Sequence, residues 1–239
     1  MPRLDVFLTK SGLIESRQRA QALILAGKVQ VSGATERRPD RSVREDEVIT
    51  VDESPGYASR GALKLGPALD EFGVDPAGRV CADIGASTGG FTDVLVRRGA
   101  AKVFAIDVGR GLIHWRLRQD PRVVVIERTN ARDLESFPEP VSLVVADVSF
   151  ISLEKVLPAV RQAAPQAEVV ALFKPQFEVG KADVGRGGIV RDPLIIDAAL
   201  LRFRTWCEGS GYQFVGEAPS EITGAEGNQE FFFHLRPVA

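Results

Sequence analysis

The sequence predicts an α/β fold, in which a mostly parallel sheet is covered by helices on both faces and is preceded by a small α+β domain. Two observations predict it. From about residue 77 of the 239, short apolar runs alternate with stretches of helical length, an order typical of a parallel sheet buried on both sides. Residues 1–44 differ in charge, because they hold nine Lys or Arg against four acids, whereas the whole chain has a net charge of −2. We therefore expect one domain at 1–55 and another at 56–239.

The composition excludes several classes of protein. With 44% hydrophobic residues the chain can bury a core, and this share is too high for a disordered chain. No apolar run approaches the ~18 residues of a membrane helix, and the N-terminal residues lack the apolar segment of a signal peptide. Cys81 and Cys207 have no neighbouring Cys or His, so we expect reduced thiols in a core. We expect a soluble cytoplasmic protein without a membrane partner or a metal, and the sequence leaves its oligomeric state open.

The first domain is expected to hold a helix followed by short strands. Residues 16–27 predict the helix, with Ser16 as N-cap and Gly27 as the C-terminal stop. Residues 28–31 and 47–51 alternate like strands, and Ser32-Gly33 marks a tight turn. Basic side chains cluster around the start of the helix and this turn, where they suit phosphate contacts. On charge alone, a solvated basic face without a ligand explains them equally well.

A family resemblance decides between these two explanations. The residues that carry it are Arg3-Leu4-Asp5, Gly12-Leu13, Ser16-Arg17, Leu23-Ile24, Gly27-Lys28-Val29, Val31-Ser32-Gly33 and Asp46-Glu47-Val48. They resemble the S4 domain, a small RNA-binding module of ribosomal and RNA-modifying proteins. The resemblance implies that structured RNA binds to the basic helix and turn. The residues expected to contact RNA are Arg3, Arg17, Arg19, Lys28, Arg37, Arg38 and, in the second domain, Arg60.

The second domain is expected to contain five parallel strands and a final hairpin. The expected strands cover residues 80–84, 103–108, 123–127, 143–148 and 169–173, and the expected helices cover 59–72, 90–98, 152–164 and 194–207. The strands are continuous apolar runs, as is typical of strands buried on both faces. Residues 213–215 and 230–235, separated by a short polar turn, predict an antiparallel hairpin at one side of the sheet. The order of the strands does not follow from the sequence.

A glycine-rich turn follows the first of these strands, with the sequence Asp83-Ile84-Gly85-Ala86-Ser87-Thr88-Gly89-Gly90-Phe91. Glycines let a ligand approach the backbone, and the helix that follows presents free N–H groups. Asp107 ends the next strand and can accept both hydroxyls of a ribose. The glycine spacing differs from the G-x-G-x-x-G of dinucleotide sites, and Asp83 favours an ammonium or sulfonium group over a diphosphate. The turn therefore indicates a cationic, adenosine-containing cofactor, with a purely structural turn as the alternative.

This segment resembles the S-adenosylmethionine-binding motif of the class I methyltransferases, whose sheet is Rossmann-like. The resemblance implies S-adenosylmethionine as the cofactor. It assigns Asp107 to the ribose and Asn130 to the adenine. The residues that match the first motif are Asp83, Gly85, Ser87, Gly89, Gly90 and Phe91.

Four polar residues stand at unusual places in the second domain. Lys64 lies off the apolar side of its predicted helix, four residues after Arg60. Asp147 and Lys174 each end an apolar strand, where side chains face the same crevice as the glycine-rich turn. Glu230 begins a run that continues with three phenylalanines. Taken singly, each also fits a solvated or snorkelling side chain.

Together, the four residues suit methyl transfer to a hydroxyl. A sugar hydroxyl is a weak acid, so a general base must take its proton during in-line attack on a sulfonium carbon. A lysine, with an ordinary pKa of ~10.4, can serve when desolvation or a second cation favours its neutral form. The order Lys64, Asp147, Lys174, Glu230 resembles the Lys-Asp-Lys-Glu tetrad of FtsJ-type ribose 2′-O-methyltransferases.

The strings around the tetrad are similar to one subfamily, the TlyA or haemolysin A-like family, and the resemblance covers nearly the whole chain. These strings are Ser59-Arg60-Gly61-Ala62-Leu63-Lys64-Leu65, Ala146-Asp147-Val148-Ser149-Phe150, Phe173-Lys174-Pro175-Gln176-Phe177-Glu178 and Gly227-Asn228-Gln229-Glu230-Phe231. Membership implies S-adenosylmethionine-dependent 2′-O-methylation of cytidines in ribosomal RNA, with ribosomal RNA or subunits as partners. It also implies that Lys174 is the base, that Lys64 and Asp147 position the sugar, and that Glu230 supports the lysines.

A long loop and three alternative functions complete the expectations. Residues 175–192 lack periodicity, and we hypothesise an RNA-clamping lid that uses Arg186 and Arg191. The alternatives are a non-catalytic RNA-binding protein, a membrane-lytic protein and a nicotinamide oxidoreductase. The presence of all four tetrad residues disfavours a non-catalytic RNA-binding protein. The lack of a strongly amphipathic segment disfavours a membrane-lytic protein, and the glycine spacing disfavours an oxidoreductase.

Overall fold

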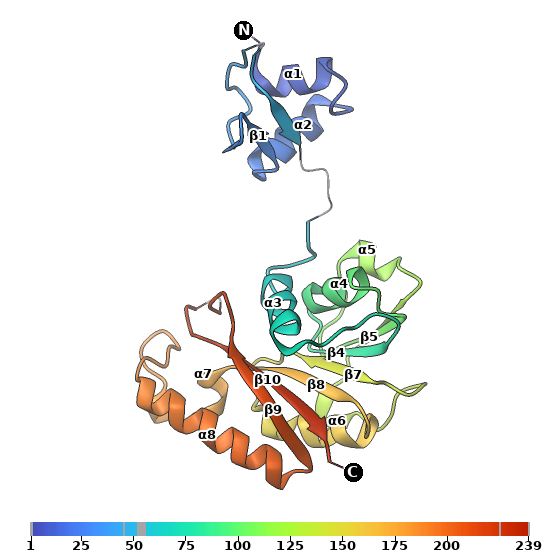
Figure 1. The fold of residues 1–239 in the computed structure, drawn as a ribbon, viewed down its shortest axis with the longest axis vertical. Coiled ribbons are helices and arrows are strands. Elements are labelled where there is room, and N and C mark those ends of the chain that lie inside the picture. Colours follow the sequence, from blue (N-terminus) through green and yellow to red (C-terminus); the bar gives the residue numbers. More distant parts are fainter. Residues whose placement is uncertain (1, 45, 52–55, 225, 239) are drawn as a thin grey trace. The chain divides into compact units, whose positions relative to one another are not determined.

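The computed structural model describes residues 2–44, 46–51, 56–224 and 226–238 (Figure 1). This part of the chain divides into two compact units, with the boundary between Gly56 and Tyr57. The predicted boundary after residue 55 falls at the edge of a segment, 52–55, that lies outside the described residues. Each unit is treated below by itself.

The first unit packs two helices on a small antiparallel sheet. Its elements are α1 (Leu4–Lys10), α2 (Arg17–Leu25), β1 (Val29–Val31), β2 (Ala34–Glu36) and β3 (Ile49–Val51), and the strand order is β2-β1-β3. Ser16 caps α2 as predicted, because its hydroxyl accepts a hydrogen bond from the Arg19 N–H. Ser32 and Gly33 both have positive φ, the geometry of a two-residue hairpin whose twist matches its strands. The predicted helix and turn are therefore present, and their core includes Leu4, Leu8, Ile24 and Val29.

The second unit contains a seven-stranded mixed sheet in the order β6-β5-β4-β7-β8-β10-β9. The strands are β4 (Val80–Ile84), β5 (Lys102–Asp107), β6 (Val123–Glu127), β7 (Leu143–Ala146), β8 (Glu168–Phe173), β9 (Tyr212–Pro219) and β10 (Phe231–Pro237). The first five run parallel, and β10 pairs antiparallel with both β8 and β9. The predicted hairpin at one side of the sheet is therefore confirmed. β9 extends to Pro219, beyond the predicted end at residue 215, so the connection to Phe231 is shorter than the predicted bounds leave.

Helices cover both faces of this sheet, as predicted. They are α3 (Ala62–Phe72), α4 (Gly90–Arg97), α5 (Trp115–Arg118), α6 (Leu157–Ala163), α7 (Pro175–Glu178) and α8 (Pro193–Gly209), with short 3₁₀ turns η1 (Ala131–Asp133), η2 (Leu153–Lys155) and η3 (Lys181–Asp183). Successive strand residues enter opposite cores: Val169 and Ala171 join the core with α6 and α8, whereas Val170 and Leu172 join the core with α3 and α4. This alternation explains why the strand sequences are continuously apolar.

Two helix predictions differ from the structure at their starts. The helix predicted over 59–72 begins at Ala62, since Ser59, Arg60 and Gly61 form the turn that leads into it. The helix predicted over 152–164 is divided into η2 and α6, with Pro158 in the first turn of α6. A proline is favoured there because its missing N–H would have no partner inside the helix. Both cysteines are free and buried as predicted, and burial raises the pKa of each thiol to about 12.

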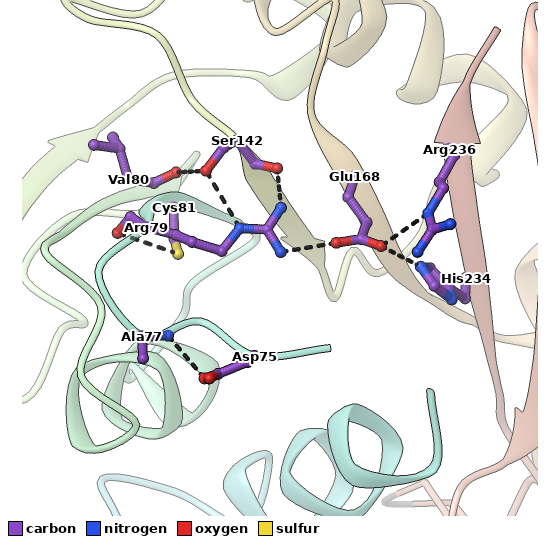
Figure 2. A network of polar contacts seen from close by, with 9 residues as sticks. All are labelled: Asp75, Ala77, Arg79, Val80, Cys81, Ser142, Glu168, His234 and Arg236. Carbon is purple, nitrogen blue, oxygen red and sulfur yellow. Dashed lines mark hydrogen bonds and ion pairs between the residues drawn. The ribbon is translucent and has the colours of Figure 1, made fainter. Parts of the chain in front are cut away.

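A polar network ties β10 to the parallel strands at one end of the sheet (Figure 2). Glu168, the first residue of β8, contacts Arg79 Nη1 at 2.7 Å, His234 Nε2 at 2.7 Å and Arg236 Nε at 3.2 Å. Arg79 also donates to the Ser142 carbonyl. Burial opposes ionisation of Glu168, but the hydrogen bonds from Arg79, His234 and Arg236 outweigh it and lower the pKa to about 2. The network lies at the beginning of β8, so it fixes β10 at the end of the sheet opposite to that where β7 and β8 terminate.

Candidate active site

The glycine-rich turn between β4 and α4 lies tightly against the neighbouring strands. Gly85 has φ +84°, and a Cβ atom there would lie 2.4 Å from the Asp147 carbonyl oxygen. The N–H groups of Gly85 and Ala86 donate to the Ile106 carbonyl at 2.9 and 3.0 Å. Only glycine satisfies both this φ and this approach. The turn therefore connects the ends of β4, β5 and β7.

Asp83 is fully buried and anchors α4. Its Oδ2 accepts hydrogen bonds from the Thr92 N–H at 2.8 Å and the Thr92 hydroxyl at 2.6 Å, while Oδ1 has no hydrogen-bond partner among the described residues. Burial raises the pKa of Asp83 to about 7, and the nearby Asp147 and Asp107 add to this, against the Thr92 hydrogen bonds. Asp83 is not among the residues that line the two cavities described next. The structure thus places it beneath the turn, where it holds the start of α4.

One cavity of about 270 Å³ opens at the ends of β5 and β7. Asp107 and Asn130 both line it. The Asp107 carboxylate accepts the Ser87 N–H and the Gly109 N–H, each at 2.7 Å, so it holds two loops at the cavity wall. The Asn130 side chain accepts the Arg132 N–H at 3.1 Å and caps η1. The two residues predicted to face the ribose and the adenine are therefore brought to one cavity.

A second cavity, of about 190 Å³, adjoins the first. It is lined by Ser87, Gly90 and Phe91 of the turn and α4, and by Arg60, Lys64 and Asp147. Gly85, Ser87 and Asp147 line both cavities. Gly89 lines neither, and a Cβ atom on it would lie 2.3 Å from Leu117 Cδ1. Gly89 therefore permits α5 to pack on the turn.

Lys64 and Glu230 form a largely buried ion pair. Lys64 Nζ lies 2.5 Å from Glu230 Oε2, and the Glu230 residue is 2% exposed. Lys64 comes from α3 and Glu230 directly precedes β10, so the pair joins segments that are 166 residues apart. A charge at this depth requires a partner, because its desolvation is otherwise uncompensated.

Lys174 and Asp147 form a second ion pair. Lys174 Nζ lies 2.6 Å from Asp147 Oδ1 and donates a hydrogen bond to Ser149 Oγ at 2.9 Å. Asp147 follows β7 and Lys174 follows β8; these strands are parallel neighbours, so their carboxyl ends reach the same edge of the sheet. Lys174 is 8% exposed. The structure thus brings the four predicted residues together as two pairs, and one member of each pair, Lys64 and Asp147, lines the same cavity.

Sequence reasoning missed two residues of this site. Ser149 contacts the Lys174 ammonium, as described above. Phe150 lines the larger cavity, is 90% exposed, has φ +63° and lies 5.1 Å from the Phe177 ring. An exposed phenylalanine in a left-handed conformation is unusual and typical of a functional position. Both residues belong to the Asp147-Val148-Ser149-Phe150 string, but a sequence alone does not distinguish an exposed phenylalanine from one of the core.

Most of the predicted RNA contacts in the first unit are engaged within that unit. Arg3 and Arg17 contact the fully buried Asp5 at 3.1 and 3.0 Å. Burial opposes the ionisation of Asp5, but hydrogen bonds from Arg3, Gln21 and Arg17 hold its pKa well below the usual range. These two arginines therefore have a structural role in addition to any contact with RNA.

The remaining basic residues lie at the surface or in shallow hollows. Arg19 pairs with Glu15 at 3.5 Å and Arg38 with Glu36 at 3.3 Å. Arg37 donates to the Leu25 carbonyl, and Lys28 lines a polar hollow beside Gly27. In the second unit, Arg60 is exposed at the smaller cavity. Across the described ranges, no helix combines the length and apolar character needed to cross a membrane.

Comparisons with known proteins agree with this geometry. The family model of FtsJ-like methyltransferases matches residues 57–237, and that of the S4 domain matches residues 2–49. The 16S/23S rRNA (cytidine-2'-O)-methyltransferase TlyA of Mycobacterium tuberculosis is 50% identical over 239 residues, which cover 98% of this chain and 89% of the relative. Hemolysin A of Brachyspira hyodysenteriae is 41% identical over 98% of this chain and 99% of the relative. A solved structure from Streptococcus thermophilus aligns with a TM-score of 0.75 and 39% identity, covering 99% of this chain and 88% of that one.

Proposed function

The chain belongs to the FtsJ-like methyltransferase family and carries an S4 domain, and from this premise we propose that it methylates the ribose 2′-hydroxyl of cytidine in ribosomal RNA. The cofactor is S-adenosylmethionine. The observation that carries the proposal is the pairing of Lys174 with Asp147 and of Lys64 with Glu230 beside the glycine-rich turn. Since ribosomes are the site of the substrate, we also place the activity in the cytoplasm.

The residues present fit S-adenosylmethionine. Gly85 lines both cavities, and Asp107 and Asn130 stand at the larger one, where they would hold the ribose and the adenine. Ser87, Gly90 and Phe91 would face the remainder of the molecule from the second cavity. When bound, the cofactor supplies an electrophilic methyl group. Asp83 would act indirectly, because it fixes the start of α4 from below.

The side chains at the strand ends would then handle the proton of the ribose. Lys174 would act as the general base in its neutral form, in which its amine can take the ribose proton, and Asp147 and Ser149 hold that amine at the carboxyl end of β8. Lys64 lines the cavity and would contact the sugar, while Glu230 fixes the Lys64 ammonium. Because Lys174 and Glu230 are nearly inaccessible to water, these groups need little reorganisation during the reaction.

Phe150 would bind the base of the target nucleotide. Its ring is free in solvent at the edge of the larger cavity, three residues after Asp147. Sequence-specific RNA enzymes splay single nucleotides out and stack their bases on aromatic side chains. The S4 domain would supply phosphate contacts that position the RNA without selecting its sequence.

The first prediction concerns the base. Lys174→Ala and Lys174→Met should lower kcat by at least about 10²-fold, because a positioned general base contributes about 10² to 10⁴. Transfer of a radiolabelled methyl group from S-adenosylmethionine to ribosomal subunits measures this, and mapping of 2′-O-methyl groups identifies the nucleotide. Calorimetric titration should show that both variants still bind the cofactor.

Two results would contradict the proposed function. Wild-type protein that transfers no methyl group to any ribosomal RNA, or that labels a base instead of a ribose, would exclude it. A non-catalytic RNA-binding protein would instead bind ribosomal RNA and give no heat with S-adenosylmethionine.

A further inference from the structure

We propose that Asn228 is a positioning residue that fastens the loop of residues 185–191 to the turn from which Glu230 starts. Through Asn228, the position of this loop and the position of the Lys64–Glu230 ion pair depend on each other. The inference rests on the proposed function for the part that Glu230 plays in methyl transfer.

The Asn228 amide is buried and hydrogen-bonded at both its oxygen and its nitrogen. The residue is 1% exposed, its Oδ1 accepts the Val190 N–H at 2.9 Å, and its Nδ2 donates to the Gly188 carbonyl at 2.8 Å. One side chain therefore satisfies two main-chain groups of a loop that lies 38 to 40 residues earlier in the chain. A buried main-chain group left without a partner is costly, and an amide can satisfy both the Val190 N–H and the Gly188 carbonyl because it carries an acceptor and a donor.

The main chain of Asn228 closes the turn against which Glu230 packs. Its carbonyl accepts the Gly224 N–H at 2.9 Å. A Cβ atom on Gly224 would lie 2.5 Å from Glu230 Oε1, so the carboxylate rests directly on this glycine. The other oxygen, Oε2, is the one that contacts Lys64. The position of the turn therefore decides where the Glu230 carboxylate meets the lysine.

The loop on the other side of Asn228 presents cations to solvent. Gly185 and Ile189 form a β-bridge that makes it a tight unit, and Arg186 and Arg191 within it are exposed. Arg191 Nη1 donates to the Arg186 carbonyl at 3.4 Å. In Figure 1 this loop precedes α8 and rises on the same side of the sheet as the β9–β10 connection, to which the Asn228 bonds join it.

These contacts form one physical path from the exposed loop to the tetrad. A phosphate bound by Arg186 or Arg191 acts on a segment whose main chain is bonded to Asn228, and Asn228 closes the turn under Glu230. The loop predicted as an RNA-clamping lid thus has a direct mechanical connection to a tetrad residue. Its engagement with RNA would fix Glu230, and through it Lys64, in the geometry for reaction.

The test compares Asn228→Ala and Asn228→Asp with a matched control, Tyr212→Phe. Asp keeps the shape and the acceptor for Val190 but sets a carboxylate oxygen against the Gly188 carbonyl. Tyr212→Phe also removes one buried side-chain hydrogen bond, to the Leu157 carbonyl, from the other end of the same hairpin. Both Asn228 variants should lower kcat about 10-fold or more with KM for ribosomal RNA changed less than about 3-fold, while the control keeps kcat within about 2-fold. Equal kcat in Asn228→Ala and Tyr212→Phe would overturn the proposal.

A double-mutant cycle tests whether Asn228 acts through Glu230. In a Glu230→Gln background, Asn228→Ala should lower kcat by less than about 2-fold further, because the group that it positions is already lost. If the kcat loss of the double variant equals the product of the losses of Asn228→Ala and Glu230→Gln, the two residues act independently and the proposal is wrong.

Hydrogen exchange separates this inference from the proposed function. Asn228→Ala should raise exchange at residues 185–191 and 226–231, and the control should not. Unchanged protection of these residues would refute the proposed link between the loop and the turn, even in an active enzyme. Increased exchange in a protein that methylates no ribosomal RNA would support the link made by Asn228 and refute the proposed methyltransferase function.

Discussion

At the scale of single residues, the site is a set of buried charges that satisfy each other. The site holds two ion pairs without net charge, Lys64 with Glu230 and Lys174 with Asp147. Each partner compensates the desolvation of the other, which would otherwise oppose burial. The hydroxyl of Ser149 is a further acceptor for Lys174. An amine has three donor positions, so Asp147 and Ser149 together restrict how Lys174 can face a substrate hydroxyl.

Removal of the Ser149 hydroxyl should slow the reaction without weakening the cofactor complex. Hydrogen bonds to charged groups contribute about 1.5 to 3 kcal/mol, but Ser149 is exposed, so we expect Ser149→Ala to lower kcat about 5- to 10-fold. Steady-state kinetics with saturating RNA measures this, and calorimetry should give a Kd for S-adenosylmethionine within about 2-fold of wild type. Ser152→Ala, which removes the cap of η2 in the same segment, is the control and should leave kcat nearly unchanged. Equal losses in the two variants would mean that Ser149 only stabilises the loop.

At the scale of elements, the two ends of the sheet have different tasks. The carboxyl ends of β7 and β8 bring Asp147 to the cavities and Lys174 to Asp147, and the opposite end of the sheet holds β10 in place through Glu168 (Figure 2). β10 is antiparallel, so its first residues lie beside the end of β8, where Phe231 pairs with Phe173. The Glu168 network at the far end of β10, called the Glu168 clamp below, therefore contributes to the placement of Glu230 next to Phe231.

The Glu168 clamp should make stability dependent on pH in the acid range. The pKa of Glu168 is lowered from 4.5 to about 2 in the folded protein, so its stabilisation is present above about pH 4.5 and is lost as the pH falls toward 2. The full shift corresponds to roughly 3 kcal/mol, and Glu168→Gln should lower Tm at pH 7 accordingly. Thermal unfolding of both proteins from pH 7 to pH 2.5 should show the difference in Tm shrinking below pH 4.5. A difference that stays constant over this range would show that the carboxylate charge does not stabilise the clamp.

At the scale of the whole molecule, the described residues form two compact units. The smaller unit has a core of its own, and its buried Asp5 neutralises two of the arginines that the sequence assigned to RNA. The larger unit contains both cavities and the tetrad. Arg19 pairs with the exposed Glu15, and Arg38 pairs with Glu36 of the edge strand β2; such pairs contribute little to stability.

Loss of two surface arginines should therefore change RNA affinity and leave the chemical step intact. The double variant Arg19→Ala/Arg38→Ala should raise KM for ribosomal RNA several-fold, keep kcat within about 2-fold, and reduce the salt dependence of binding by about one to two counterions. Binding isotherms at several salt concentrations and steady-state kinetics measure both effects. Lys155→Ala, which removes one exposed positive charge from the larger unit, is the control and should leave RNA affinity nearly unchanged. Unchanged RNA affinity in the double variant would remove these two arginines from the interface.

The fold and the identity of the candidate tetrad were open to prediction because both depend on local patterns. Alternate burial on two faces makes a parallel strand continuously apolar, and a proline or glycine marks where an element starts or stops. The failures have physical causes too. The length of β9 was underestimated because Gly216 and Glu217 interrupt its apolar pattern, whereas pairing with His234 and Phe233 of β10 keeps both residues in the strand. The burial of Asp83 beneath the turn did not follow from the sequence, because it depends on the packing of α4.

The sequence by itself determined the strands and the glycine-rich turn, because each depends on neighbours a few positions away, and its resemblance to a family named the four candidate residues. Only the tertiary structure decided which lysine pairs with which acid, that Ser149 and Phe150 belong to the site, and that Asn228 joins the loop to Glu230. These contacts link residues from 25 to 166 positions apart. Burial makes each such contact specific, since an unpaired charge or amide costs several times more inside the protein than at its surface.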